Sequence, residues 1–280
     1  MAKGFIEKVN NIREKIDGNR YEAIKIYKKL EPWNENSWTL KTVTIPEVYS
    51  VITNMKKSNS RGNDNLTARI IKEMPSFIAT TVCHLFNCMV RCVKFPKALK
   101  IARLTPILKP GKVDMDIELY RPIANLNVIE KVVEELFKKQ LEKFFKEYNV
   151  ITPKHHSSRK GHSTATAKAT LDMNITSTRE KQLAAGVIRT DLSAAYDTVD
   201  SNLLLNKLEH VGVRFKELEL VRTYLTSRKA YIEIQGFFSE LMDQPDCSMI
   251  QGSKLSTTFY MVYTLDITEV NELINDPEEF

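Results

Sequence analysis

The chain has 280 residues, of which 42% are hydrophobic and 27% are charged. This is the composition of a globular protein that is long enough to bury a substantial core. No apolar run approaches the roughly 20 residues of a membrane-spanning helix, and the charged N-terminus does not have the form of a signal peptide. We therefore expect a protein with no membrane partner that is intracellular, in the nucleus or the cytoplasm.

Positive charge is concentrated in the middle of the chain. The formal net charge is +6, with 41 Lys and Arg residues against 35 Asp and Glu residues. Between Arg91 and Lys112 every charged residue is basic, whereas only acidic charged residues follow Lys254. A basic block of this kind can follow a phosphate backbone, and the plainer interpretation is a solvated loop and helix surface. Charge alone leaves both interpretations open.

Helices are predicted where apolar residues recur at three- and four-residue spacing. A first helical region covers residues 1–30, and Thr44 has the position of a cap for a helix that begins with Ile45 and Pro46. Further helices are predicted at 66–73, 76–93, 127–146, 163–181, 201–211, 215–224 and 256–273. The longest is expected to bury Val128, Val132, Leu136, Leu141 and Phe144 or Phe145.

Strands are predicted at 101–108, where Pro106 favours an edge or a bulge, and at 185–191. A hairpin is predicted to join 230–234 to 237–241. Helices with a few separated strands indicate an α+β fold. Residues 1–43 are interpreted as a helical N-terminal extension, and residues 44–280 as the main domain.

A carboxylate stands at the end of the predicted strand 185–191. This strand ends on Asp191, the aromatic Tyr196 follows five residues later, and a leucine-rich helix then begins. Phosphoryl transfer from a nucleoside triphosphate needs metal ions held by hard oxygen ligands, for which the Asp191 carboxylate and the Leu192 carbonyl are candidates. Taken alone, an aspartate at a strand end is most often a helix cap or a surface residue.

Six other short segments carry recognisable motifs. They are Ser60-Arg61-Gly62-Asn63-Asp64, Phe95-Pro96, Leu104 to Lys112 with its terminal Lys-Pro-Gly-Lys, Tyr120-Arg121-Pro122-Ile123, Arg159-Lys160-Gly161-His162-Ser163-Thr164 and Gln251-Gly252-Ser253-Lys254-Leu255-Ser256. In this order, and together with 187–200, they resemble the motifs of reverse transcriptases from non-LTR (LINE-type, jockey-like) retrotransposons. The resemblance covers roughly 44–268 and implies the fingers and a partial palm of a right-hand polymerase.

The resemblance also implies an activity. Members of this family are RNA-directed DNA polymerases, which copy an RNA template by adding dNTPs to the 3′-hydroxyl of a DNA primer with Mg²⁺. In such a reaction two metal ions clamp the attacking and leaving oxygens. By resemblance, Asp191 is the catalytic residue and, with the Leu192 carbonyl, a ligand of Mg²⁺.

Five residues are implied in nucleotide binding. Lys109 and Arg121 would hold the triphosphate of the incoming nucleotide, a role that suits cations and especially a guanidinium fork; exposed surface charge is their alternative. Tyr196 would lie under the sugar and favour deoxynucleotides, or be a buried core tyrosine. Gln251 and Gly252 would position the nucleotide, because glycine permits a close approach of the backbone.

The chain also departs from the family pattern. Ile250 and Thr257 stand where the family has prolines, and no Asp-Asp pair occurs anywhere in the chain. The family's aromatic-Ala-Asp-Asp motif supplies ligands for the second metal, so we expect a chain that is truncated before this motif and inactive alone. The alternative is a non-catalytic nucleic-acid-binding or protein-interaction remnant. Asp197 is interpreted as a structural cap rather than a ligand.

Overall fold

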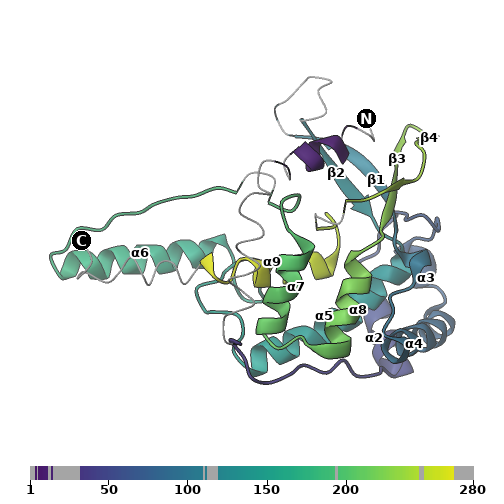
Figure 1. Cartoon of the computed structure of the whole chain (residues 1–280), viewed down its shortest axis with the longest axis horizontal. Coiled ribbons are helices and arrows are strands. Elements are labelled where there is room, and N and C mark those ends of the chain that lie inside the picture. Colours follow the sequence, from purple (N-terminus) through teal and green to yellow (C-terminus); the bar gives the residue numbers. More distant parts are fainter. Residues whose placement is uncertain are drawn as a thin grey trace.

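The computed structural model describes residues 4, 6–11, 14, 32–109, 111, 119–192, 195–245 and 249–267. A sheet lies at one end of the molecule, most helices pack together beside it, and helix α6 (Thr164–Glu180) extends away from this body (Figure 1). This mixture of helices with a sheet agrees with the predicted α+β class.

The sheet has five strands in the order β2-β1-β3-β4, with β5 also paired to β3. They are β1 (Ile101–Leu108), β2 (Tyr120–Asn125), β3 (Lys229–Ile234), β4 (Phe237–Phe238) and β5 (Met242–Asp243). β1 pairs antiparallel with β2 from Arg103 to Leu108, but parallel with β3 only from Ile101 to Leu104. Pro106 therefore lies in the half of β1 that does not reach β3, where its missing N–H costs no ladder hydrogen bond to that strand.

The predicted strand at 101–108 and the predicted hairpin are confirmed, although β4 is shorter than the expected 237–241. Gln235 and Gly236 in the hairpin turn have positive φ angles of 51° and 84°. Two successive positive φ angles are typical of a type I′ turn, which matches the twist of the flanking strands. β2 has no counterpart among the predicted strands, because its buried residues do not alternate along the strand.

The predicted strand at 185–191 is wrong. Residues 183–192, called the arm below, have no strand pairing and are exposed throughout, with Ile188 87% exposed. A strand needs a neighbour for its backbone N–H and C=O groups, and the pairings of β1 to β5 do not include this segment. Asp191 consequently lies near the end of an exposed, unpaired segment.

The predicted helices from Thr44 onward are confirmed, with shifts at their ends. They are α2 (Ile45–Asn54), α3 (Ala68–Ile71), α4 (Pro75–Cys92), α5 (Val128–Glu147), α6, α7 (Ser201–His210), α8 (Phe215–Leu225) and α9 (Lys254–Tyr263), with the short 3-10 helix η1 (Lys97–Leu99). α2 begins at a capping box, in which the Glu47 carboxylate accepts a hydrogen bond from the Thr44 backbone N–H at 2.7 Å. Of the predicted helix 1–30, the described residues 4, 6–11 and 14 are helical; its other residues, and 268–273, lie outside the described part.

The core centres on α5, against which α2, α4 and α9 pack. The predicted apolar stripe of α5 is buried, including both Phe144 and Phe145. Part of the predicted N-terminal extension joins the same core: the Trp38 ring lies 5.0 Å from the Phe137 ring, and the Leu40 N–H donates to Glu217 Oε1 at 3.1 Å. The domain boundary at residue 43 stays a prediction.

Helix α6 contrasts with this core, because none of its 17 residues is buried. Its start is fixed locally, since the Ser163 hydroxyl accepts a hydrogen bond from the Thr166 N–H at 3.3 Å. Neither α6 nor any other helix in the described part of the chain has the length and apolar character needed to cross a membrane.

Candidate active site

The residues predicted to bind metal and nucleotide surround one open cavity of about 1390 Å³, which we call the polar cavity. All seven of them line it: Lys109, Arg121, Asp191, Leu192, Tyr196, Gln251 and Gly252. They belong to three parts of the chain, namely the β1–β2 hairpin, the segment that precedes α7 and the segment that precedes α9. The structure therefore brings together residues that are up to about 140 positions apart in the sequence.

The β1–β2 hairpin brings the two predicted phosphate-binding cations to the same end of the sheet. Lys109 directly follows β1, and its backbone N–H donates to the Leu119 carbonyl at 2.8 Å. Arg121 lies in β2, opposite Ile107. The antiparallel register thus places a lysine and an arginine next to each other on the rim of the polar cavity.

The segment before α9 is fixed against β2. The Gln251 carbonyl accepts a hydrogen bond from the Ala124 N–H at 2.8 Å. Gly252 has a φ of +118°, and a Cβ added there would lie 2.5 Å from the Ala124 carbonyl oxygen. Glycine is therefore required at 252 by the close approach of β2, whatever else approaches from the cavity side.

Tyr196 is half-buried, so that it both lines the cavity and packs against the protein. Its ring stacks on Tyr260, with 5.1 Å between the ring centroids and an angle of 23° between the planes. Its carbonyl accepts a hydrogen bond from the Met249 N–H at 2.8 Å. Burial raises the pKa of the Tyr196 hydroxyl, so Tyr196 is a neutral, ordered wall of the polar cavity.

The interpretation of Asp197 as a structural cap is wrong. The cap of α7 is Asp200, whose Oδ1 accepts a hydrogen bond from the Leu203 N–H at 2.8 Å. Asp197 instead lines the polar cavity, and its Oδ1 accepts a hydrogen bond of 3.4 Å from Gln251 Nε2. Burial raises the pKa of the Asp197 carboxyl, an effect opposed by the positive charge of Lys8, by the Gln251 hydrogen bond and by Lys109.

Asp197 is thus a second carboxylate of the candidate site, although the sequence analysis interpreted it as a structural cap. The signal for it is its place directly after Tyr196, six residues beyond Asp191.

The polar cavity offers oxygen donors of the kind that Mg²⁺ takes. Asp191, Asp197 and the Leu192 carbonyl belong to residues that line the polar cavity. Mg²⁺ is usually held by one or two carboxylates together with the phosphates of a substrate. Within the described ranges, no group of three or more His, Cys, Asp or Glu side chains is placed to hold a metal. The chemistry of the described donors is thus compatible with Mg²⁺, and two carboxylates and a carbonyl leave further ligand positions to other groups.

A buried polar cluster, the Glu134 cluster, fixes the start of α9 behind the cavity. Glu134 accepts hydrogen bonds from the Tyr224 hydroxyl at 2.6 Å, the Ser253 hydroxyl at 2.7 Å and the Lys254 N–H at 3.0 Å. Burial raises the pKa of Glu134, and these hydrogen bonds oppose the rise. Because Ser253 is also the cap of α9, the cluster holds the residue next to Gly252 in place.

A second buried acid lies one turn before Glu134. Glu130 Oε1 is 2.6 Å from Arg228 Nη2, and both side chains are buried. Burial raises the pKa of Glu130 to about 8, although the nearby Arg228 opposes the rise. The sequence analysis assigned no role to Glu130, Glu134, Tyr224 or Arg228, because the bonded partners are 90 or more residues apart.

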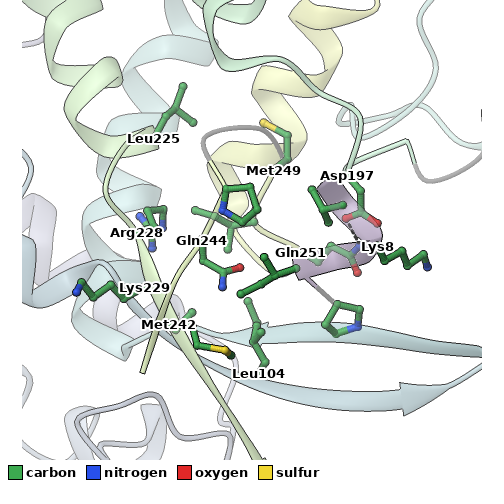
Figure 2. A pocket seen from close by; sticks show the side chains of 17 residues that line it. Lys8, Leu104, Asp197, Leu225, Arg228, Lys229, Met242, Gln244, Met249 and Gln251 are labelled. Atoms are coloured by element: carbon green, nitrogen blue, oxygen red, sulfur yellow. Dashed lines mark hydrogen bonds between the residues drawn. The ribbon is translucent and has the colours of Figure 1, made fainter. Parts of the chain in front are cut away.

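A second cavity, of about 910 Å³, adjoins the polar cavity and is called the apolar cavity (Figure 2). Leu104 of β1, Leu225 at the end of α8 and Met249 are among its apolar walls. Asp197 and Gln251 line both cavities, and Figure 2 shows the hydrogen bond between them at the border.

Residues 107–274, more than half of the chain, match the family model described as "Reverse transcriptase (RNA-dependent DNA polymerase)". The probable RNA-directed DNA polymerase from transposon BS of Drosophila melanogaster is 25% identical over 238 residues, which cover 85% of this chain and 26% of that relative. The RNA-directed DNA polymerase from mobile element jockey is 27% identical in Drosophila funebris, over 82% of this chain, and 26% identical in Drosophila melanogaster, over 94%.

The matched parts are 25% and 30% of those two jockey relatives, so the chain spans between about a quarter and a third of the length of the relatives it matches. The family match includes every predicted site residue from Lys109 to Gly252. It confirms the resemblance that the motifs and their order indicated. The chain therefore belongs to the reverse transcriptase family, and its relatives are the jockey-like, non-LTR mobile elements.

Proposed function

We propose that this chain forms the nucleotide-binding part of an RNA-directed DNA polymerase that adds dNTPs to a primer 3′-hydroxyl. The observation that carries the proposal is the convergence of seven predicted residues from three distant parts of the chain on the polar cavity. In this proposal the β1–β2 hairpin belongs to the fingers, and α7 to α9 belong to the first part of the palm. An RNA template and a DNA primer are the proposed partners.

Lys109 and Arg121 bind the phosphates of the incoming nucleotide. Both lie at the same end of the β1–β2 hairpin and line the cavity. A guanidinium offers two parallel N–H groups to phosphate oxygens, and an ammonium adds a point charge. Positive charge fixed on strands is available without a large rearrangement, which favours tight binding.

Asp191, the Leu192 carbonyl and Asp197, which line the same cavity, would hold the Mg²⁺ ion. When bound, this ion neutralises charge that develops on the phosphates. Tyr196, which is ordered by its stacking on Tyr260, lies under the sugar and disfavours a 2′-hydroxyl. Gln251 and Gly252 position the nucleotide from the start of α9.

Nucleotide binding and catalysis are separable in this chain. Two-metal phosphoryl transfer requires more acidic ligands than Asp191 and Asp197 provide, and the chain contains no Asp-Asp pair. We therefore expect these 280 residues to bind a dNTP with Mg²⁺ but not to extend a primer by themselves. Primer extension on an RNA template that Asp191→Ala abolishes would contradict this expectation.

Equilibrium binding of a fluorescent dNTP in the presence of Mg²⁺ tests the proposal. Lys109→Ala and Arg121→Ala should each weaken binding about tenfold, as expected for the loss of a charge-assisted hydrogen bond. Lys168→Ala is the matched control, because it removes the same charge from an exposed position on α6. Absence of binding, or an equal loss with Lys168→Ala, would overturn the proposal.

A further inference from the structure

The described residues 6–11 form a helical segment that lies beside the sheet near β2 (Figure 1). Its two sides differ in exposure: Ile6, Lys8 and Val9 are half-buried, whereas Glu7 and Asn10 are exposed. Ile6 and Val9 are three residues apart and so share one face of the helix, with Lys8 at the margin of that face. The segment is thus docked through one side.

Ile6 and Val9 line the apolar cavity, together with Leu104 of β1. Lys8 lines both the apolar and the polar cavity. The apolar face therefore anchors the segment on the sheet, and the anchor places the lysine at the border between the two cavities. Burial of two aliphatic side chains supplies a driving force for this docking.

Lys8 lies next to Asp197 at this border. Figure 2 shows its side chain leading past Asp197 and away from the apolar cavity. Lys8 and Asp197 each line both the apolar and the polar cavity. Lys8 therefore lines the same polar cavity as the predicted metal ligands Asp191 and Leu192.

The charges around the polar cavity give Lys8 a specific role. Among the described residues that line it, the carboxylates are Asp191 and Asp197, and the cations are Lys109, Arg121 and Lys8. With Lys109 and Arg121 alone, the positive and negative charges would balance. Lys8 gives the cavity an excess of positive charge, which suits a ligand that carries several negative charges.

We propose that Lys8 is a third cation of the nucleotide site, delivered to the triphosphate by an N-terminal segment that Ile6 and Val9 anchor in the apolar cavity. This inference rests on the proposed function and deepens it, because it assigns a residue of the N-terminal extension to nucleotide binding. The alternative role of Lys8 is to neutralise Asp197, in which case its ammonium would compete with the metal ion for this carboxylate. Lys109 also lines the polar cavity with Asp197, so Lys8 is not the sole cation of this cavity beside that carboxylate.

The test compares dissociation constants of a fluorescent dNTP at fixed Mg²⁺ and ionic strength. Lys8→Ala should weaken binding about five- to tenfold, and Lys8→Arg should retain most of it, because the charge is kept. Val9→Asn should weaken binding as much as Lys8→Ala does, since it removes the apolar anchor and leaves the charge of the segment unchanged. The loss should shrink when the triphosphate is replaced by the corresponding monophosphate.

Two control variants show whether a loss of binding is specific to Lys8 and its anchor. Asn10→Ala changes an exposed position of the same segment and should leave binding unaltered, as should Lys168→Ala on α6. Lys109→Ala reports on the proposed function independently of the N-terminal segment. Unfolding midpoints of all variants, measured by circular dichroism, identify any loss of binding that follows from loss of the fold.

The outcomes separate the two proposals. Weaker binding with both Lys109→Ala and Lys8→Ala supports both. Weaker binding with Lys109→Ala but unchanged binding with Lys8→Ala overturns the role of Lys8 and leaves the nucleotide site intact. Tighter binding with Lys8→Ala also overturns it, in favour of a blocking lysine. Absence of nucleotide binding by the unaltered chain overturns both.

Discussion

The Glu134 cluster and the arm border the same cavity but are held in opposite ways. The Glu134 cluster is buried, and its carboxylate accepts three hydrogen bonds of 2.6 to 3.0 Å from α8 and the start of α9. The arm, residues 183–192, is exposed along its whole length and pairs with no described strand. One wall of the cavity is therefore fixed before a ligand arrives, whereas the wall with Asp191 is not.

The two walls of the polar cavity therefore differ in how their side chains are positioned. Gln251 and Gly252 are carried by the fixed wall, and Lys109 and Arg121 by a paired hairpin. Positions held by packing and hydrogen bonds keep their geometry without a ligand. Asp191 lies in the exposed arm without such support, so under the proposed function we expect its placement to depend on the metal ion and the nucleotide. We expect phosphate binding to be prepared by the fold, and metal binding to be completed by the ligand.

The largest contrast in stability is expected between Arg228→Met and Arg189→Met. The first removes a guanidinium from the buried region beside the Glu134 cluster, and the second removes one from the arm. Arg228→Met leaves Glu130 buried without its cation, which should lower the free energy of unfolding by about 3–5 kcal/mol. Arg189 is exposed in the arm, and its replacement should change stability by less than about 0.5 kcal/mol. Urea unfolding measures both, and equal losses would contradict the comparison.

A pair of glycine substitutions gives the next largest contrast. Gly252→Ala introduces a Cβ 2.5 Å from the Ala124 carbonyl oxygen at a φ of +118°, and should cost about 2 kcal/mol as well as nucleotide affinity. Gly186 in the arm has nothing within 4 Å of such a Cβ, so Gly186→Ala should be neutral or slightly stabilising. A destabilising Gly186→Ala would show that the arm is packed after all.

The buried region should also make stability depend on pH. The pKa of Glu130 is about 8 in the folded chain, above its ordinary value of 4.5. The folded state therefore binds this proton more tightly than the unfolded state, and the contribution to stability is present at low pH and lost as the pH rises from about 4.5 through about 8. The nearby Arg228 favours the ionised carboxylate and so limits this decline.

Denaturant unfolding at a series of pH values measures this effect. Glu130→Gln should flatten the decline between these pH values, because the amide does not ionise. A variant with the same pH slope as the unaltered chain would assign the titration to another group.

The smallest effect on stability is expected for the arm itself. Ile188 is 87% exposed, so Ile188→Ser should change the free energy of unfolding by less than about 0.5 kcal/mol. Limited proteolysis with trypsin should nevertheless cut first at Arg189, since exposed unpaired backbone is the preferred site of cleavage. A dNTP with Mg²⁺ should slow this cut by ordering Asp191, and cleavage that the ligand does not change would contradict that coupling.

Local signals explain which parts of the fold could be predicted. The strand at 101–108, the turn at Gln235 and Gly236, and the buried stripe of α5 are each encoded by residues close together in the sequence. The strand expected at 185–191 requires a neighbour, and no property of its own residues supplies one. An apolar run is therefore sufficient to suggest a strand but not to form it.

The candidate site likewise divides into residues that the sequence predicted and residues that it did not. Its seven predicted residues were found because they lie in short motifs, and the structure brings them to one cavity. Asp197 was interpreted as a cap, although the predicted helix start at 201 already places Asp200 at the cap position, as the structure confirms. Glu134 and Arg228 had no signal, since their partners are recognisable only after the chain has folded.

Photo-crosslinking tests the central claim most directly, that the polar cavity is the nucleotide site. An azido-dNTP would be bound with Mg²⁺, activated by light, and located by mass spectrometry of the digested chain. The account predicts labelled peptides that contain Lys109 or Arg121 and peptides from 249–257, with labelling suppressed by excess unmodified dNTP. Competable label found instead elsewhere, for example in the separate groove beside Asn59 and Arg103, would contradict it.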